Sequence, residues 1–144
     1  MKCFNILGLI SIVIIMIPNI IFALKNKDGF DNKYNNKIIE ILEQVGRFGC
    51  FIFMIINLPK VTLGYWSSNG KLVYQIVIIV LCIIYVGGWI VFWNESSVRK
   101  SLLLSVVPSL LFILCGILLL NIPLMVVSLI FAPCHIIISY KNSI

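Results

Sequence analysis

The chain has 144 residues, of which 61% are hydrophobic and 11% charged, and its mean hydropathy is +1.12. Soluble domains are about 45–50% apolar and about 25% charged, so this composition excludes a soluble secreted enzyme, a disordered protein and a nucleic-acid module. The net charge of +6 comes from basic residues between and beside apolar runs, where membrane proteins carry their orientation signals. We therefore expect one membrane domain over residues 1–144, an all-α polytopic helical bundle.

The first apolar run covers residues 4–24, which is long enough to cross the hydrocarbon core of about 30 Å as a helix. Lys2 before the run and the small Ala23 near its end loosely resemble a signal peptide. The run is longer than the apolar region of a typical signal peptide, and Lys25 and Lys27 follow it directly. We therefore expect a membrane helix that is retained in the mature protein.

The main polar segment, residues 25–45, is predicted to be a loop that leads into an amphipathic helix. Turn-forming Asp, Asn and Gly residues occupy its first half. From Asn36 onward, apolar and polar residues recur at helical spacing, which is typical of a helix at the membrane interface. The apolar side consists of Ile38, Ile39, Ile41, Leu42 and Val45, and the polar side of Lys37, Glu40, Glu43, Gln44 and Arg47.

Two further spans are predicted before residue 100. Residues 46–63 form a short one, which the amphipathic helix enters directly or after a bend at Gly46. Residues 72–93 form a clear one, in which Trp89 and Trp93 lie one turn apart near the end. Indole rings favour the headgroup region, so these tryptophans mark where the helix leaves the membrane.

The apolar stretch from residue 101 to residue 140 is too long for one span, because a helix of that length would measure about 60 Å. Asn121 is a good helix N-cap, and Pro123 suits the first turn of a helix. We therefore predict two antiparallel spans, 101–120 and 122–140, joined by a tight turn. The total is five transmembrane helices; four, with a re-entrant or surface-lying last segment, is the alternative.

Basic residues are divided unevenly between the two sides that five spans create. The positive-inside rule assigns the richer side to the cytoplasm, which places the N-terminus outside and the C-terminus in the cytoplasm. The amphipathic helix then lies on the cytoplasmic leaflet of the cell membrane, where its lysines meet anionic lipid. The cytoplasmic group is Lys25, Lys27, Lys33, Lys37, Arg47, Arg99, Lys100 and Lys141, and the outer group is Lys2, Lys60 and Lys71.

Catalytic and proton-carrying groups are not evident within the predicted spans. Proton-coupled transporters and aspartyl intramembrane proteases need carboxylates inside the bilayer. Small multidrug exporters are similar in size and hydrophobicity, but their embedded glutamate has no counterpart here. No hydrolase, metalloprotease or phosphate-binding motif is present, and the five cysteines include no C-x-x-C pair. We expect no enzymatic activity, no cofactor and no metal site. The acidic residues, all in loops or near the interface, are Asp28, Asp31, Glu40, Glu43 and Glu95.

Small polar residues form two stripes on the last two spans. Ser105 and Ser109 recur at helical spacing on the fourth span, and Ser128, His135 and Ser139 do so on the fifth. Small polar residues let membrane helices approach closely, so the simpler interpretation is a packing seam. The alternative is a polar pocket open to the cytoplasm, with the single histidine of the chain at its centre.

Two weaker polar pairs complete the candidates. Asn57 and Gln75 form a second polar level near the outer leaflet, where hydrogen bonding between spans is the default role. Glu43 and Arg47 lie four residues apart on the amphipathic helix, and a solvated surface pair is the simpler interpretation. The alternative is a buried charged pair that anchors a ligand or a lipid headgroup.

These features favour a small bacterial-type multi-pass membrane protein that acts without catalysis. Heavy use of isoleucine, asparagine and lysine is typical of a low-GC bacterial genome. We expect it to bind a membrane-protein partner in an accessory, immunity or regulatory role, or to associate with itself, and we expect no nucleic-acid partner. The alternative function is an oligomeric transporter or facilitator of a neutral or lipid-like solute. An intramembrane enzyme built on His135 and nearby serines is the third and least favoured hypothesis.

Overall fold

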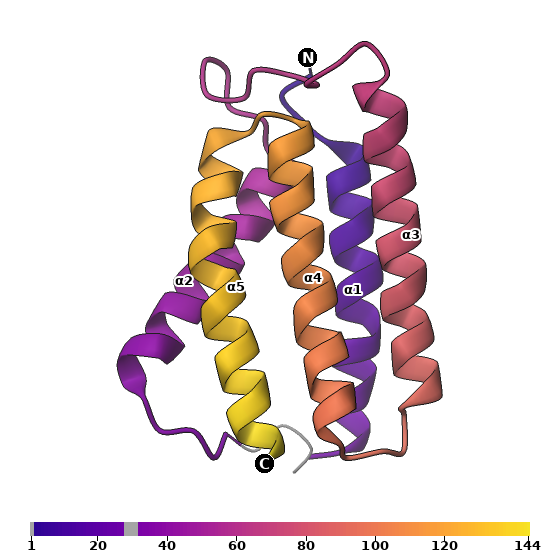
Figure 1. The fold of residues 1–144 in the computed structure, drawn as a ribbon, viewed down its shortest axis with the longest axis vertical. Coiled ribbons are helices and arrows are strands. Elements are labelled where there is room, and N and C mark those ends of the chain that lie inside the picture. The colour runs from indigo at the N-terminus through magenta and orange to yellow at the C-terminus, as the bar shows by residue number, and fades with distance from the viewer. Residues whose placement is uncertain (1, 28–31) are drawn as a thin grey trace.

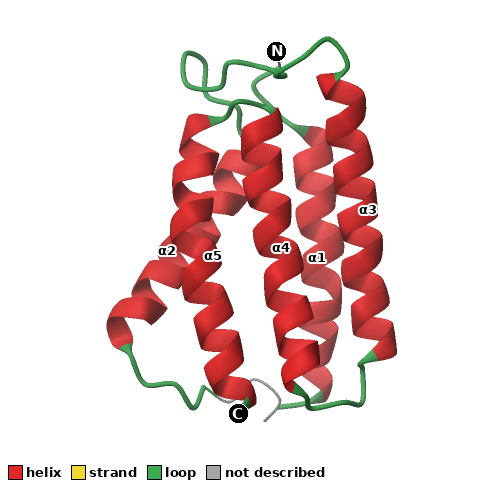
Figure 2. Cartoon of the chain, in the orientation of Figure 1, coloured by secondary structure: helices red, strands yellow, loops and turns green. Residues whose placement is uncertain are grey.

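The computed structural model describes residues 2–27 and 32–144. The helices of these residues run antiparallel along the long axis of the molecule, and the two ends of the chain lie at opposite ends of the bundle (Figure 1). The connections gather at those two ends (Figure 2). The prediction of an all-helical bundle is confirmed. Its five helices are α1 (Ile6–Lys25), α2 (Lys37–Ile55), α3 (Gly70–Val91), α4 (Val98–Leu118) and α5 (Ile122–Ser143).

Four of the helices in the described residues, α1, α3, α4 and α5, are long and apolar enough to cross a membrane. Their outward positions carry large apolar side chains such as Ile17, Leu72 and Leu129. A continuous apolar surface of this kind belongs in lipid, where the backbone of each helix satisfies its own hydrogen bonds. The protein is therefore a membrane-embedded helical bundle.

The predicted residue range of the second span, 46–63, is wrong. One helix, α2, replaces the expected amphipathic helix and the expected span over residues 46–63. It continues through Gly46 without a break and ends at Ile55, after which residues 56–63 form a loop in which apolar residues alternate with polar ones. These residues cover the end of the bundle, and hydropathy cannot distinguish such a covering loop from the end of a span. The helices α1 and α3 run in the same direction, so the chain must cross back from the end of α1 to the start of α3. The helix α2 and this loop form that return (Figure 1).

The predicted turn between the last two spans is confirmed. The Asn121 side chain caps α5 by accepting a hydrogen bond from the Leu124 N–H at 3.1 Å. Pro123 lies in the first turn, where its missing N–H has no cost. Asn121 Nδ2 also donates to the Phe53 carbonyl at 2.9 Å. One buried side chain thus joins the turn to the end of α2.

Backbone hydrogen bonds close the end of the bundle that holds the N-terminus. The Asn57 N–H donates to the Cys3 carbonyl at 2.7 Å, which pairs the loop after α2 with the N-terminal segment. The Ile122 N–H donates to the Val61 carbonyl at 3.0 Å, which pairs the same loop with the α4–α5 turn. Three segments that are far apart in the sequence therefore form one covering layer.

Large side chains fill the interior below this layer. They come from α2, α3, α4 and the start of α5, so the core lies where these helices converge. Close packing of such side chains gives the interior the density of an organic crystal. The largest fully buried apolar side chains are Met54, Tyr74, Leu111, Phe112, Leu119 and Leu124.

Candidate functional site

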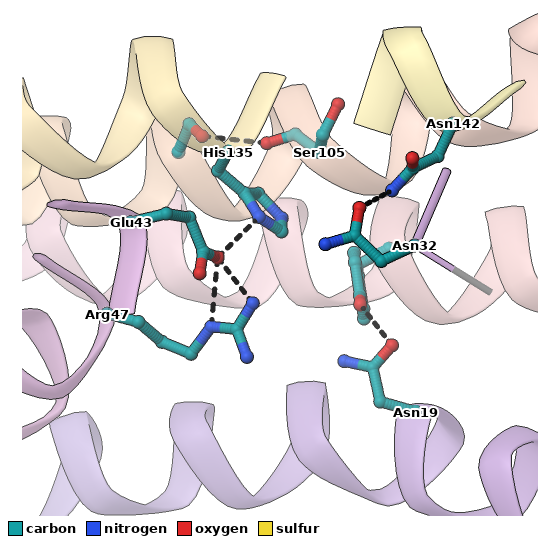
Figure 3. Close-up of polar contacts among 9 residues, drawn as sticks. Asn19, Asn32, Glu43, Arg47, Ser105, His135 and Asn142 are labelled. Atoms are coloured by element: carbon teal, nitrogen blue, oxygen red, sulfur yellow. Dashed lines mark hydrogen bonds and ion pairs between the residues drawn. The ribbon is translucent and has the colours of Figure 1, made fainter. Parts of the chain in front are cut away.

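Glu43, Arg47 and His135 meet where the charged half of α2, residues 37–47, lies against α5 (Figure 3). Glu43 Oε1 accepts hydrogen bonds from Arg47 Nε, at 3.1 Å, and from Arg47 Nη2. The same oxygen lies 2.9 Å from His135 Nδ1. Glu43 is 2% exposed, whereas the side chains of Arg47 and His135 are 35% and 21% exposed. The site is therefore a buried carboxylate bound by two side chains that reach the surface.

Two glycines of α2 bring the carboxylate into this position. A Cβ added at Gly46 would lie 2.8 Å from Phe131 Cβ, and one added at Gly49 would lie 2.9 Å from Val127 Cγ1. Such short distances mean that the backbone of α2 touches the side chains of α5, as at the small-residue contacts of membrane helices. Glu43 precedes Gly46 by almost one turn, so the same close contact carries it into the interface.

His135 is held on two sides. Its ring stacks on Phe131, with centroids 4.6 Å apart and planes inclined by 20°. For Nδ1 to donate to Glu43, the proton of a neutral imidazole must be on Nδ1, which leaves Nε2 as an acceptor. Within residues 2–27 and 32–144, Nε2 makes no hydrogen bond, and it lies on a partly exposed ring. The histidine thus has free hydrogen-bonding capacity at the surface.

The burial of Glu43 corrects the interpretation as a solvated surface pair. The predicted pairing with Arg47 four residues later is present, but its carboxylate lies in the interior and is shared with α5. The sequence did not indicate His135 as the third member, because 92 residues separate it from Glu43. A usable signal was Gly46, which lies between Glu43 and Arg47, together with Gly49 two residues after Arg47, since small residues indicate a helix face that packs closely.

Within the described residues, none of the serines of the predicted stripes is hydrogen-bonded to His135. Ser105, Ser109 and Ser128 are buried, and Ser139 is partly buried. The three buried hydroxyls each donate to a carbonyl three or four residues earlier in the same helix, at 3.1, 2.7 and 3.0 Å respectively. A hydroxyl that donates to its own helix does not donate to a neighbouring helix. Their placement fits a packing seam.

Asn57 and Gln75 are not joined by a hydrogen bond in the described part of the chain. Asn57 Nδ2 donates to the Lys2 carbonyl at 3.2 Å, so this side chain belongs to the closed end of the bundle. Gln75 lies on α3 and is half-buried. The proposed second polar level is therefore replaced by a contact between the N-terminal segment and the loop after α2.

A second polar connection lies at the same end as the Glu43 cluster (Figure 3). Asn142 Oδ1 accepts hydrogen bonds from the N–H groups of Lys33 and Tyr34, at 3.0 and 2.9 Å. Asn142 Nδ2 donates to Asn32 Oδ1 at 3.1 Å. The segment before α2 is thus tied to the last turn of α5. Asp28 and Asp31, which precede Asn32 in the sequence, lie outside the described residues.

Contacts with Glu43 leave some hydrogen-bond donors of Arg47 unused. Glu43 and Arg47 compensate each other's charge, so the pair needs no bound ion to be neutral. A guanidinium has five N–H donors, and only those on Nε and Nη2 contact Glu43. The remaining donors of Arg47 suit a carboxylate, phosphate or carbonyl oxygen.

No family model, curated protein or solved structure matches the chain.

Proposed function

We propose that the protein acts without catalysis by binding another membrane protein on the α2–α5 side of the bundle. The observation that carries this proposal is the cluster of Glu43, Arg47 and His135, which reaches the surface of an otherwise apolar bundle. Ionisable groups at membrane depth are costly and are usually retained for a function. Contacts within the chain engage Glu43 Oε1 but leave hydrogen-bonding capacity on Arg47 and His135, which a polar group of a partner would use.

The chemistry of the cluster defines the expected partner. A carboxylate or a main-chain carbonyl of the partner would accept from the free donors of Arg47, and an N–H or O–H would donate to His135 Nε2. Apolar side chains of the partner would cover Ile41, Val45 and Phe48, which are exposed on α2. Polar contacts of this kind would fix the register of the partner helix, and apolar packing would supply contact area.

Binding at the surface is better supported than conduction through a single chain. Large side chains such as Tyr74 and Phe112 fill the interior, and the buried serine hydroxyls are satisfied within their own helices. Glu43 now supplies the buried carboxylate that was not expected from the sequence. Because Arg47 compensates its charge, this carboxylate is poorly suited to taking up and releasing protons in a transport cycle.

We further propose that the protein is a multi-pass protein of the cell membrane with its N-terminus outside and its C-terminus in the cytoplasm. The basic residues at the helix ends support this orientation, because the ends of α1 and α5 and the starts of α2 and α4 lie at the end of the bundle opposite the N-terminus (Figure 1). The positive-inside rule assigns the richer end to the cytoplasm. That end holds Lys25, Lys37, Arg99, Lys100 and Lys141, where α1 and α5 end and α2 and α4 begin.

The test is the native mass of tagged protein extracted from its own membrane in mild detergent. Wild type, Arg47→Ala and Lys37→Ala are compared, because Lys37 is an exposed charge on the same helix outside the cluster. We expect wild type and Lys37→Ala to be recovered with the same amount of the same partner. Arg47→Ala should be recovered with at least about tenfold less partner. Thermal unfolding of each variant checks that the fold is intact.

Two outcomes would overturn the proposal. One is a folded Arg47→Ala variant that retains the partner fully, and the other is wild-type protein recovered as a monomer with no partner. A homo-oligomer that passes solute after reconstitution into vesicles would support the alternative function, an oligomeric transporter or facilitator of a neutral or lipid-like solute.

A further inference from the structure

A groove of about 490 Å³ runs between α1 and α3, away from the contact of α2 with α5. Isoleucines dominate its lining, among them Ile10 and Ile14 on α1 and Ile83 on α3. The lining residues of α3 extend from Ile78 to Ile90, which corresponds to about 18 Å along the helix axis. One leaflet of a hydrocarbon core of about 30 Å is about 15 Å thick. The groove therefore has the length and polarity of one lipid acyl chain.

Two adjacent glycines of α3 have different roles at this groove. A Cβ added at Gly88 would lie 2.2 Å from Leu103 Cδ2, so Gly88 is needed for packing α3 on α4. A Cβ added at Gly87 would have no heavy atom of the described chain within 4 Å. Gly87 lines the groove and leaves space in it that the protein itself does not use.

Basic and aromatic side chains flank the end of the groove nearest Ile90. The Lys25 ammonium lies 5.8 Å from the ring centroid of Trp93, so the end of α1 and the end of α3 meet there. Lys100 Nζ donates to the Trp93 carbonyl at 3.1 Å and lies 5.0 Å from the ring centroid of Trp89. Lys100 is 7% exposed, whereas Lys25 is exposed, so the Lys25 ammonium is the more accessible of the two at this end.

We propose that the α1–α3 groove binds an anionic phospholipid, with an acyl chain along the isoleucines and the phosphate at Lys25. The apolar lining matches a hydrocarbon chain, and tryptophan and lysine at its end match the interfacial position of a headgroup. The volume lies within the range of about 300–1,000 Å³ that is typical of small-molecule sites. A transmembrane helix, about 10–12 Å across, would cover this groove without entering it.

The experiment measures lipid binding to the full-length protein by native mass spectrometry. Purified protein is titrated with phosphatidylglycerol or with phosphatidylcholine of the same acyl chains. We expect wild type to favour phosphatidylglycerol by roughly fivefold, since the lysines attract an anionic headgroup. Lys25→Gln should lose most of this preference and keep the binding of phosphatidylcholine, because the groove is unchanged.

Gly87→Trp tests the acyl-chain part of the site, because the new side chain would occupy the groove without meeting another part of the chain. We expect it to bind both lipids roughly fivefold more weakly. Leu129→Trp is the matched control, since Leu129 is exposed on α5 away from the groove, and it should bind lipid like wild type. Thermal unfolding of both tryptophan variants checks the fold.

Three outcomes would overturn the proposal. They are equal binding of the two lipids by wild type, unchanged binding by Gly87→Trp, and a change of oligomeric state in Gly87→Trp without a change in lipid binding. The last would identify the groove as a contact between protein chains. None of these results bears on the partner site, because Gly87 and Lys25 lie outside the Glu43 cluster.

Discussion

Backbone hydrogen bonds help to close one end of the bundle, whereas at the other end the described segments are joined through side chains. At the end that holds the N-terminus, the loop after α2 pairs through its backbone with the N-terminal segment and with the α4–α5 turn. At the opposite end, α2 and the segment before it are joined to α5 through the side chains of Glu43, His135 and Asn142. Backbone pairing survives most substitutions, whereas side-chain contacts do not. The charged half of α2 is therefore the part of the fold that a few residues control.

The largest effect is expected at the backbone-paired end, from Gly8→Ala. A Cβ at Gly8 would lie 2.0 Å from the Met54 carbonyl oxygen, a backbone atom that cannot move aside while the end stays closed. We expect the free energy of unfolding in detergent to fall by about 3 kcal/mol. Gly87→Ala is the matched control and should be neutral or stabilising by up to about 1 kcal/mol, because alanine favours the helix. Equal losses in both variants would contradict the close approach of α1 to α2.

Glu43→Ala should have the largest effect at the side-chain end. Removing one partner of a buried ion pair costs about 3–5 kcal/mol, and the part-exposed Arg47 and His135 can turn toward more polar surroundings, so we expect a loss of about 2–3 kcal/mol. Unfolding by denaturant measures the loss of unfolding free energy in Glu43→Ala, and Lys37→Ala is measured in parallel as the control. A loss no greater than that of Lys37→Ala would show that the carboxylate does not hold α2.

Asn121→Ala is expected to cost about 2 kcal/mol, because it removes both the cap of α5 and the hydrogen bond to the Phe53 carbonyl. Asn121→Ser keeps an oxygen that can cap the helix but cannot reach Phe53, so it should lose about half as much. Thermal unfolding of the two variants separates these contributions. If serine is as damaging as alanine, the cap contributes little.

The smallest effect is expected from Asn142→Ala, which acts on exposed groups. The loss in unfolding free energy should stay below about 1 kcal/mol. Amide hydrogen exchange should nevertheless become faster at Lys33 and Tyr34, whose N–H groups lose their acceptor. Unchanged exchange at these two amides would show that Asn142 does not fix the segment before α2.

Most of the fold was predictable, because the residues next to each helix end determine where that helix begins and ends. The spans α1, α3, α4 and α5 are apolar runs bounded by charges, turns or the cap at Asn121. The end of α2 was not predictable, because the apolar residues among 56–63 belong to a covering loop and not to a span. They pair with the N-terminal segment and the α4–α5 turn, and such pairing depends on contacts between distant parts of the chain.

The candidate site was predictable only within one helix. Helical spacing indicated the pairing of Glu43 with Arg47, and hydropathy singled out His135 as an ionisable group within a span. Sequence spacing does not show which face of one helix meets which face of another. That choice depends here on Gly46, whose missing side chain lets α2 reach Phe131 and thus places Glu43 beside His135.

The most direct test of the claim that Glu43 holds the charged half of α2 on α5 is amide hydrogen exchange of Glu43→Gln beside wild type. We expect exchange over residues 38–47 to become about tenfold faster, equivalent to about 1.4 kcal/mol of local stability. Exchange over residues 56–66 should stay the same, because backbone pairing at that end does not involve this side chain. Equal exchange of the two proteins over residues 38–47 would contradict the claim.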